Sequence, residues 1–209
     1  MSIDLDPAAP AERGDMSAAD YELAKRKSNF GDLPESYARE AAPEVAPLAP
    51  AGPMPLDITK AQAFLDACVK AHVTYGLGAK VPFYHAAPGR DFTKVDCSGF
   101  VRETILEATE KAIPFPDGSV VQHHWVKARG YPHSSVDAAK ASDQKVRIAF
   151  LSPNASSEGI GHVVLIYQAR TLESHGHHGP GSRPWNGEAW QANTAVYTLA
   201  EITATALVS

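Results

Sequence analysis

The sequence predicts an α+β fold, with helices in the first part of the folded region and strands in the second. Three observations support this order. Apolar residues recur with the helical period of about 3.6 in residues 57–72 and 96–112. Prolines and glycines interrupt the chain between and after these segments, as in loops. The segments 146–151, 162–169 and 195–199 then carry the β-branched and apolar residues typical of strands.

The N-terminal 56 residues differ in composition from the rest of the chain. Five prolines between residues 43 and 55 are interleaved with alanines, a composition that gives an extended spacer with little surface to bury. We therefore divide the chain into a Pro/Ala-rich N-terminal arm, 1–56, and a folded domain, 57–209. Within the arm, Ser17 is suited to cap a short helix that reaches about Lys25. The arm is either a flexible tail or a docking arm that orders on a partner.

The folded domain begins with three expected helices. Asp57 is suited to cap the first, which extends to about His72. The second covers residues 96–112 and is stopped by Pro114. The third covers residues 120–129 and ends at a glycine.

The strand at residues 162–169 alternates, so that His162, Val164 and Ile166 share one face. A short turn follows, and residues 172–179 are expected to return as its hairpin partner.

Bulk composition excludes several classes of function. The net charge is −5 and the pI about 6.0, without a basic stripe, so nucleic-acid binding is not expected. The longest apolar runs fall far short of the roughly 20 residues that span a bilayer. Residues 1–6 are acidic and lack the hydrophobic core of a signal peptide. We therefore expect synthesis in the cytoplasm without a signal peptide, and delivery by other means if the target lies outside.

Cys97 occupies the most informative position in the chain, where an extended segment turns into the second helix. Helix N-termini carry unpaired N–H groups and the positive end of the macrodipole, and both favour a thiolate over a thiol. The thiolate is the nucleophile in cysteine catalysis, so this placement predicts a reactive cysteine with a lowered pKa. Ser98 and Gly99 are small and leave room for a substrate carbonyl at that helix end. Cys68, on the apolar stripe of the first helix, is expected to be a buried core thiol.

A cysteine hydrolase also needs a base and a group that orients the base. His162 begins a strongly apolar strand and is the expected base. In the hairpin, His175 would come to lie next to His162, because facing residues on paired strands are about 5 Å apart. We expect His175 to orient His162, with His177 or a loop residue as alternatives.

The sequence contains further histidines near these positions, at 123, 124 and 178, which raises the question of a metal site. It contains neither an HExxH nor a pair of CxxC motifs. No metal and no cofactor are therefore expected.

Several of these residues together resemble the NlpC-type cysteine peptidases, which are papain-like cell-wall hydrolases. The resemblance rests on Asp-Cys-Ser-Gly-Phe at 96–100, Gly-His-Val at 161–163 and the histidine at 175. Tyr75-Gly76 looks like the tyrosine-glycine element that precedes the nucleophile in that family, and Gln122 resembles a glutamine found between nucleophile and base. The ordered set covers about residues 57–200.

The resemblance implies a central antiparallel sheet packed against helices, with the cysteine at a helix N-terminus facing histidines of the sheet. It implies Cys97 as nucleophile, His162 as base, His175 as the orienting residue and Tyr75 as a hydroxyl on the oxyanion or substrate side. It also implies cleavage of amide bonds in peptidoglycan stem peptides, commonly between D-glutamate and a diamino acid.

The chain departs from the family pattern beside the expected cleft. The usual Gly-Asp pair before the base strand is replaced by residues 145–150, and a long polar insert spans 152–161. Arg183 is a candidate clamp for a free carboxylate of a stem peptide, because guanidinium binds carboxylate through two hydrogen bonds.

The predicted function is a thiol-dependent peptidoglycan hydrolase, a D,L-endopeptidase whose partner is the stem peptide. We expect it to act on the wall after delivery by a phage particle, a phage lysis system or a secretion machine, with a virion component, secretion machine or immunity protein as candidate partners of the arm. The alternatives are an N-acetylmuramoyl-alanine amidase, an acyl transferase, or a non-catalytic structural component of a virion or injection apparatus.

Overall fold

The structure is a computed structural model and describes residues 16–31 and 52–202. The helices are α1 (Ala18–Phe30), α3 (Ile58–Lys70), α4 (Cys97–Ala108), α5 (Ser119–Ala128) and α6 (Ala189–Ala192). The strands are β1 (Thr74–Tyr75), β2 (Lys94–Val95), β3 (His133–Ser134), β4 (Lys145–Leu151), β5 (His162–Tyr167), β6 (Arg170–His175), β7 (Gly179–Gly181) and β8 (Thr194–Glu201). Short 3₁₀ turns lie at Ala138–Lys140 and Pro153–Ala155. The predicted α+β class is confirmed.

Six strands form one sheet in the order β3-β8-β4-β5-β6-β7, and all neighbouring pairs are antiparallel. A separate two-stranded parallel pair joins β1 to β2. The expected hairpin is present, since β5 and β6 pair around a turn at Gln168 and Ala169. Both turn residues have positive φ, 50° and 56°, as in a type I′ turn, whose twist matches that of the strands.

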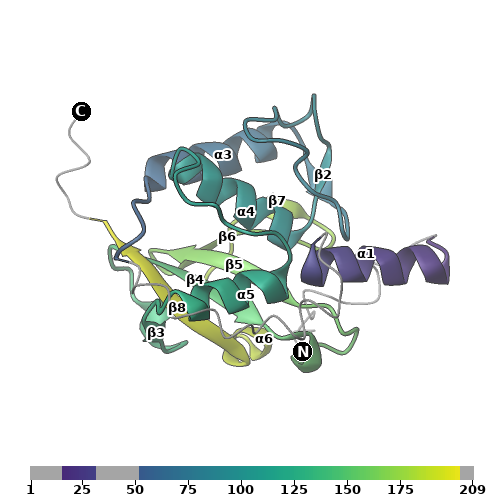
Figure 1. Cartoon of the computed structure of the whole chain (residues 1–209). Helices are drawn as coiled ribbons and strands as arrows, with labels where there is room; N and C mark the ends of the chain where they lie inside the picture. The colour runs from purple at the N-terminus through teal and green to yellow at the C-terminus, as the bar shows by residue number, and fades with distance from the viewer. Residues whose placement is uncertain (1–15, 32–51, 203–209) are drawn as a thin grey trace.

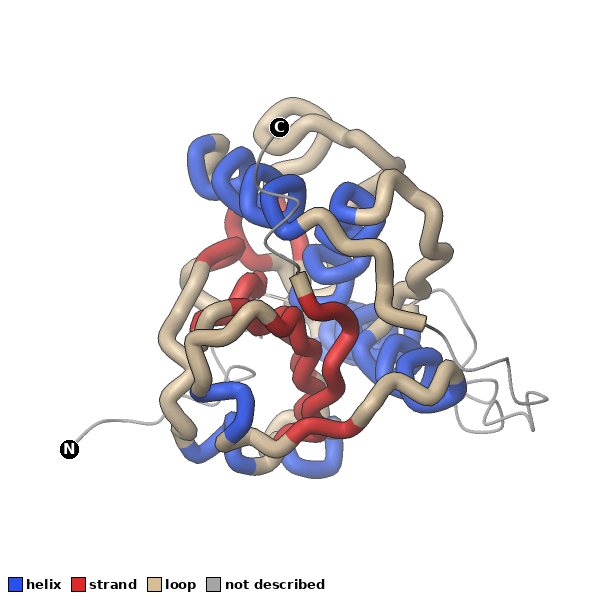
Figure 2. Tube along the Cα trace, turned by 90° about the vertical axis from the view of Figure 1, so that its left-hand side faces the viewer, coloured by secondary structure: helices blue, strands red, loops and turns tan. Residues whose placement is uncertain are grey.

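Helices cover the two faces of the sheet unequally. In Figure 1, α3, α4 and α5 lie on one face of the sheet and the short α6 on the other. Figure 2 gives the same arrangement from the side, with helices in blue and strands in red. The strands between these layers are buried on both faces along most of β4 and β5, which explains their nearly continuous apolar sequence.

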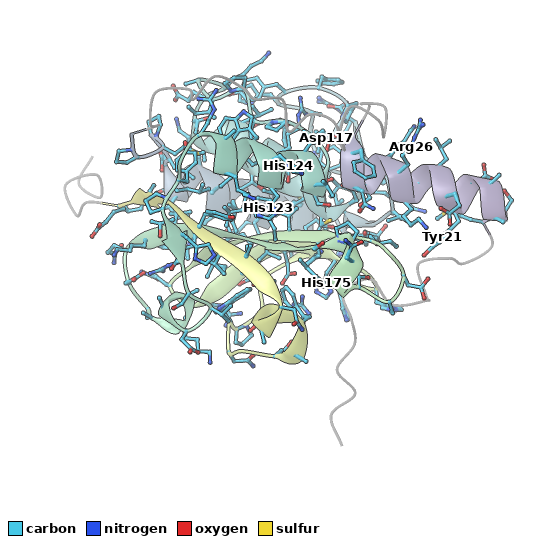
Figure 3. All side chains as sticks on the ribbon, turned by 60° about the horizontal axis from the view of Figure 1, so that its bottom comes forward. Tyr21, Arg26, Asp117, His123, His124 and His175 are labelled. Atoms are coloured by element: carbon cyan, nitrogen blue, oxygen red, sulfur yellow. The ribbon has the colours of Figure 1, made fainter. Side chains whose placement is uncertain are left out.

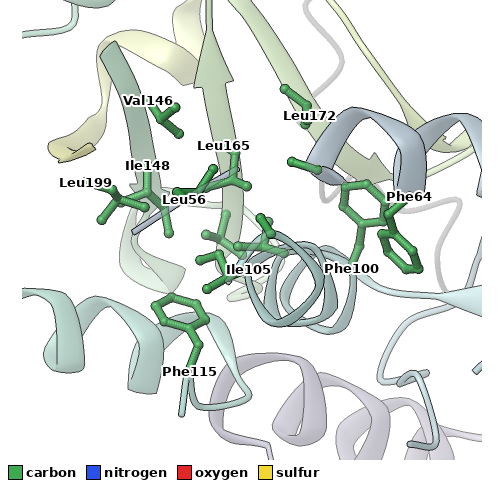
Figure 4. Packing of buried hydrophobic residues seen from close by; sticks show 14 of the residues in the cluster. Leu56, Phe64, Phe100, Ile105, Phe115, Val146, Ile148, Leu165, Leu172 and Leu199 are labelled. Carbon is green, nitrogen blue, oxygen red and sulfur yellow. The ribbon is translucent and has the colours of Figure 1, made fainter. Parts of the chain in front are cut away.

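The larger core lies between the sheet and the helical layer of α3, α4 and α5. Figure 4 shows side chains of Ile105 on α4 next to those of Ile148 and Leu165 on the sheet. Phe64 of α3 stacks on Phe100 of α4 at 5.6 Å between ring centroids. The main core thus fixes α4, and with it Cys97, against the strands.

A smaller core lies on the opposite face. It joins Val164 and Ile166 of β5 to Trp185 and Trp190. Strand alternation explains this division, because Val163 and Leu165, the intervening residues, belong to the larger core.

Helix caps agree with the sequence. Asp57 accepts hydrogen bonds from the N–H groups of Thr59 and Lys60, and Asp96 accepts one from Gly99 at 2.7 Å. The second helix is shorter than expected: α4 ends at Ala108 rather than near residue 112. Glu110 and Lys111 follow with φ of 49° and 60°, a left-handed conformation that ends the helix before Pro114 is reached.

The expected helix in the N-terminal arm is present as α1, with Ser17 as its cap. It packs against the domain, and Met54 and Leu56 are buried in the main core. The compositional boundary at residue 57 therefore does not coincide with the edge of the packed structure. Residues 1–15 and 32–51, the rest of the proposed tail or docking arm, lie outside the described residues.

Among the helices within residues 16–31 and 52–202, none combines the length and apolar character that crossing a bilayer requires.

Candidate functional site

Cys97 is the first residue of α4, directly after the capping residue Asp96, as the sequence predicts. Its sulfur lies 3.8 Å from the carbonyl oxygen of Gly161, next to the start of β5. The side chain is fully buried. The thiol thus lies against the backbone that leads into His162.

The environment of this thiol corrects the expectation of an ionised cysteine. Burial raises the pKa of Cys97 from its ordinary value of 9.0 to about 12, and the negative charge of Asp96 adds to this effect. Lys80, the N–H of Val163 and the hydroxyl of Ser28 lower the pKa and offset only part of the increase. Desolvation of a buried group outweighs the helix terminus here, so the thiol is neutral at physiological pH.

A partly buried ionic network surrounds the first turn of α4. The ammonium of Lys80 lies 2.7 Å from Asp96, 3.0 Å from Asp117 and 2.6 Å from the hydroxyl of Ser98. Burial alone would lower the pKa of Lys80, but the two carboxylates outweigh it and raise the pKa, so the lysine stays charged. Ser98, expected to leave room for substrate, is instead buried and bound within this network.

The imidazole of His162 is held by a carboxylate, Glu173, that is not among the site residues expected from the sequence. Nε2 of His162 lies 2.9 Å from Oε2 of Glu173. Glu173 in turn accepts two hydrogen bonds from Arg183, at 2.8 and 2.9 Å. Burial would raise the pKa of Glu173, but the hydrogen bonds from His162 and Arg183 hold it well below its usual range.

This hydrogen bond also assigns the proton on the ring. A carboxylate can only accept, so Nε2 of His162 carries a proton, and in the neutral form of the ring the lone pair is on Nδ1. A carboxylate that fixes the tautomer of a histidine is the arrangement that general bases use.

His175 does not take the orienting position. The β5–β6 register, extended by three residues, places it opposite His162, but its Nδ1 hydrogen-bonds the carbonyl of Gly176 at 3.1 Å. Burial lowers the pKa of His175 to about 4. Glu173 is the residue in contact with His162, and His177, the alternative, is exposed at the turn. Figure 3 places His175 on the other side of the sheet from His123 and His124 of α5.

The structure does not bring the nucleophile and the base into contact. The ring of His162 packs edge-on against Trp190 at 5.5 Å, on the α6 side of the sheet. The thiol of Cys97 belongs to the main core, on the α4 side. Across the described residues, no hydrogen bond links the Cys97 sulfur to an imidazole. The two groups lie on different sides of the same strand.

Four residues were expected on the substrate or oxyanion side, and three of them, Ser98, Gln122 and Arg183, are bound by other groups of the protein. Arg183 pairs with Glu173 instead of presenting a free clamp. Gln122 is buried, and its amide donates to the carbonyls of Ser98 and Pro116 at 2.9 and 3.0 Å. Tyr75 is half-buried and packs beside a small cluster of Tyr21, Leu77 and Ile160.

The alternation of side chains along a strand could have indicated Glu173. It lies two residues before His175 and therefore on the same face of β6. Its side chain reaches His162 along the diagonal between paired strands. No local pattern marks Lys80 or Asp117, because each meets the site only through the tertiary fold.

Acid is expected to destabilise the protein through two histidines, His175, which is buried, and His123, which is partly buried. Burial lowers the pKa of both His123 and His175 from 6.5 to about 4. Protonation therefore favours the unfolded chain, so their stabilising effect is complete above pH 6.5 and is lost as the pH falls toward 4. The free energy of unfolding should drop by up to about 1.4 kcal/mol per pH unit for each imidazole.

Urea unfolding between pH 7 and pH 4 measures this slope. The double variant His123→Gln, His175→Gln should show a flatter profile than the parent. A parent whose stability does not change between pH 6.5 and 4.5 would contradict the expectation.

Within the described residues, no cluster of three or more histidine, cysteine or acidic side chains is arranged to hold a metal ion. The chain matches no protein-family model and no curated protein sequence.

Proposed function

We propose that this chain is a cysteine hydrolase with a papain-like NlpC-type fold that cleaves amide bonds in peptidoglycan stem peptides. One observation carries the proposal: a cysteine that begins a helix abuts the start of a strand whose first residue is a histidine held by a buried carboxylate. The motif resemblance around Cys97 and His162 points to the wall peptide as substrate. In this proposal, the described conformation is a closed form of the enzyme.

In the proposed mechanism, the site opens and the first turn of α4 and the start of β5 shift relative to one another, until Nδ1 of His162, still bound to Glu173 through Nε2, reaches Cys97 and takes the thiol proton. The thiolate attacks the amide carbonyl, and the backbone N–H of Cys97 at the helix start donates to the oxyanion. Protonated His162 gives its proton to the leaving amine, and a thioester with Cys97 remains. Water, deprotonated by His162, then hydrolyses the thioester and regenerates the thiol.

Glu173 takes the orienting role in this mechanism. Its hydrogen bond keeps the proton on Nε2 and leaves Nδ1 to act as base. Arg183 acts through Glu173 as a positioning residue, because its two hydrogen bonds fix the carboxylate.

Product analysis of digested peptidoglycan tests the proposal. A D,L-endopeptidase releases fragments with a free amino terminus on the diamino acid, which mass spectrometry identifies. Intact stems without sugar would instead indicate the amidase, and joined peptides the acyl transferase. No digestion of walls of several chemotypes would contradict the hydrolase.

One observation favours a second candidate, a non-catalytic structural component. The Cys97 thiol is fully buried and lies on the opposite side of β5 from His162. A domain that retains the fold without the chemistry would show this arrangement permanently. It would digest no wall, and its thiol would stay unreactive in every variant that still folds.

A further inference from the structure

We propose that α1 is an inhibitory cover over Cys97, which must move aside before a substrate reaches the thiol. The proposal rests on the proposed function for its purpose, but its physical claim concerns only access to the sulfur. It assigns a regulatory role to a segment that lies outside the region of family resemblance.

The C-terminal end of α1 binds the backbone beside the thiol. The side-chain amide of Asn29 donates to the carbonyl of Gly159 at 3.0 Å and accepts from the N–H of Gly161 at 2.8 Å. Gly161 is also the residue whose carbonyl lies next to the Cys97 sulfur. The side chain of Asn29 thus binds both a backbone N–H donor and a backbone carbonyl acceptor of residues 159–161, which border the site.

An amide is also the group that a peptide substrate presents. A substrate peptide bond laid along residues 159–161 would need the same backbone N–H and C=O groups that Asn29 uses. Asn29 and a bound peptide therefore exclude one another at this position.

Ser28 completes the cover. It is fully buried, and its carbonyl accepts a hydrogen bond from the hydroxyl of Ser98 at 3.1 Å. Its own hydroxyl lies close enough to Cys97 to lower the pKa of the thiol. Ser28 and Asn29 thus stand between the sulfur and the solvent on this side.

Two glycines of the domain lie in close contact with the backbone of α1. A side chain at Gly78 would place its Cβ 2.7 Å from the carbonyl oxygen of Ala24, and one at Gly118 would place it 2.5 Å from the carbonyl carbon of Phe30. Both contacts are shorter than a Cβ tolerates. Glycine at these two positions therefore lets the backbone of α1 approach closely.

Few side chains of α1 hold it against the domain. Tyr21, Ser28 and Asn29 are its only buried residues, and Leu23 is 45% exposed. Figure 3 shows Tyr21 and Arg26 pointing to different sides of α1. Cavities of about 910 and 830 Å³ flank the helix. Its apolar contact is confined to Tyr21 and Ala24, which pack against Leu77 and Ile160, so lifting α1 exposes a limited apolar surface, which suits a reversible cover.

The rate at which iodoacetamide alkylates Cys97 in the full chain tests the proposal, with mass spectrometry of the labelled peptides as readout. Asn29→Ala removes two hydrogen bonds of the cover and should raise the rate by about tenfold or more. Tyr21→Ala removes the anchor near the other end of α1 and should have the same effect. In both variants, amides of α1 should exchange hydrogen faster, while those of β4 and β5 keep their protection.

Two controls sharpen the test. Leu23→Ala changes an exposed position of the same helix and should leave the rate unchanged. Cys68, buried in α3, should stay unlabelled throughout, which shows that the domain remains folded. An unchanged Cys97 rate in both Asn29→Ala and Tyr21→Ala would overturn the cover.

Wall digestion by the same variants separates this inference from the proposed function. Faster labelling of Cys97 without wall digestion would support the inhibitory cover and contradict the hydrolase proposal. If the parent and Asn29→Ala digest the wall at equal rates and their Cys97 is labelled at equal rates, the result would support the hydrolase proposal and contradict the inhibitory cover.

Discussion

Replacing Cys97 by alanine is expected to abolish wall digestion, with a loss of about 10⁴-fold or more, the scale for removing a catalytic nucleophile. Alanine cannot form the thioester, whereas the buried site accepts the smaller side chain at a cost of about 1 kcal/mol in stability. The measurement is the release of soluble fragments from purified peptidoglycan by parent and variant at equal concentration.

Cys68→Ala provides a matched control. Cys68 is also a free, fully buried cysteine, but it lies within α3 and not at the start of α4. It should retain activity close to that of the parent. Equal activity in parent and Cys97→Ala would show that the sulfur has no part in the reaction and would favour the structural candidate.

Glu173→Ala is expected to cause the largest loss of stability of any single change at the site, about 3–5 kcal/mol, the usual cost of removing one partner of a buried ion pair. The substitution leaves the guanidinium of Arg183 and Nε2 of His162 without their acceptor in a region where Glu173 itself is fully buried. Urea unfolding at pH 7 measures the loss.

Asp137→Ala is the control for this prediction, because the Asp137–Lys140 pair lies at the surface, with side chains 86% and 41% exposed. Exposed pairs contribute about 0–1 kcal/mol. A Glu173→Ala variant no less stable than Asp137→Ala would mean that Arg183 and His162 find new partners. Glu173→Gln keeps the shape and one acceptor oxygen, so a smaller loss is expected.

The sequence predicted the framework of the fold because its signals are local. The cap at Asp57, the helix start at Cys97 and the β5–β6 hairpin depend on residues close together in the chain, and all three are present. The end of α4 was placed too far along, since the left-handed conformation of Glu110 and Lys111 has no strong sequence signature.

The candidate site was predicted less completely because its state depends on burial and on distant contacts. The position of Cys97 follows from sequence, but its raised pKa follows from packing beneath α1 and beside Asp96. The choice of Glu173 over His175 depends on side-chain reach across a hairpin, which strand register alone does not decide. An arm defined by its prolines also gave no sign that Asn29 binds beside Gly161.

The two edges of the six-stranded sheet are its shortest strands. β3 has two residues, and β7 is the three-residue segment Gly-Pro-Gly, in which Pro180 has no N–H to offer. An incoming strand from a second molecule therefore finds almost no continuous ladder of donors and acceptors to extend. The architecture protects the concentrated protein against edge-to-edge aggregation without any charged residue in the outermost strand β7.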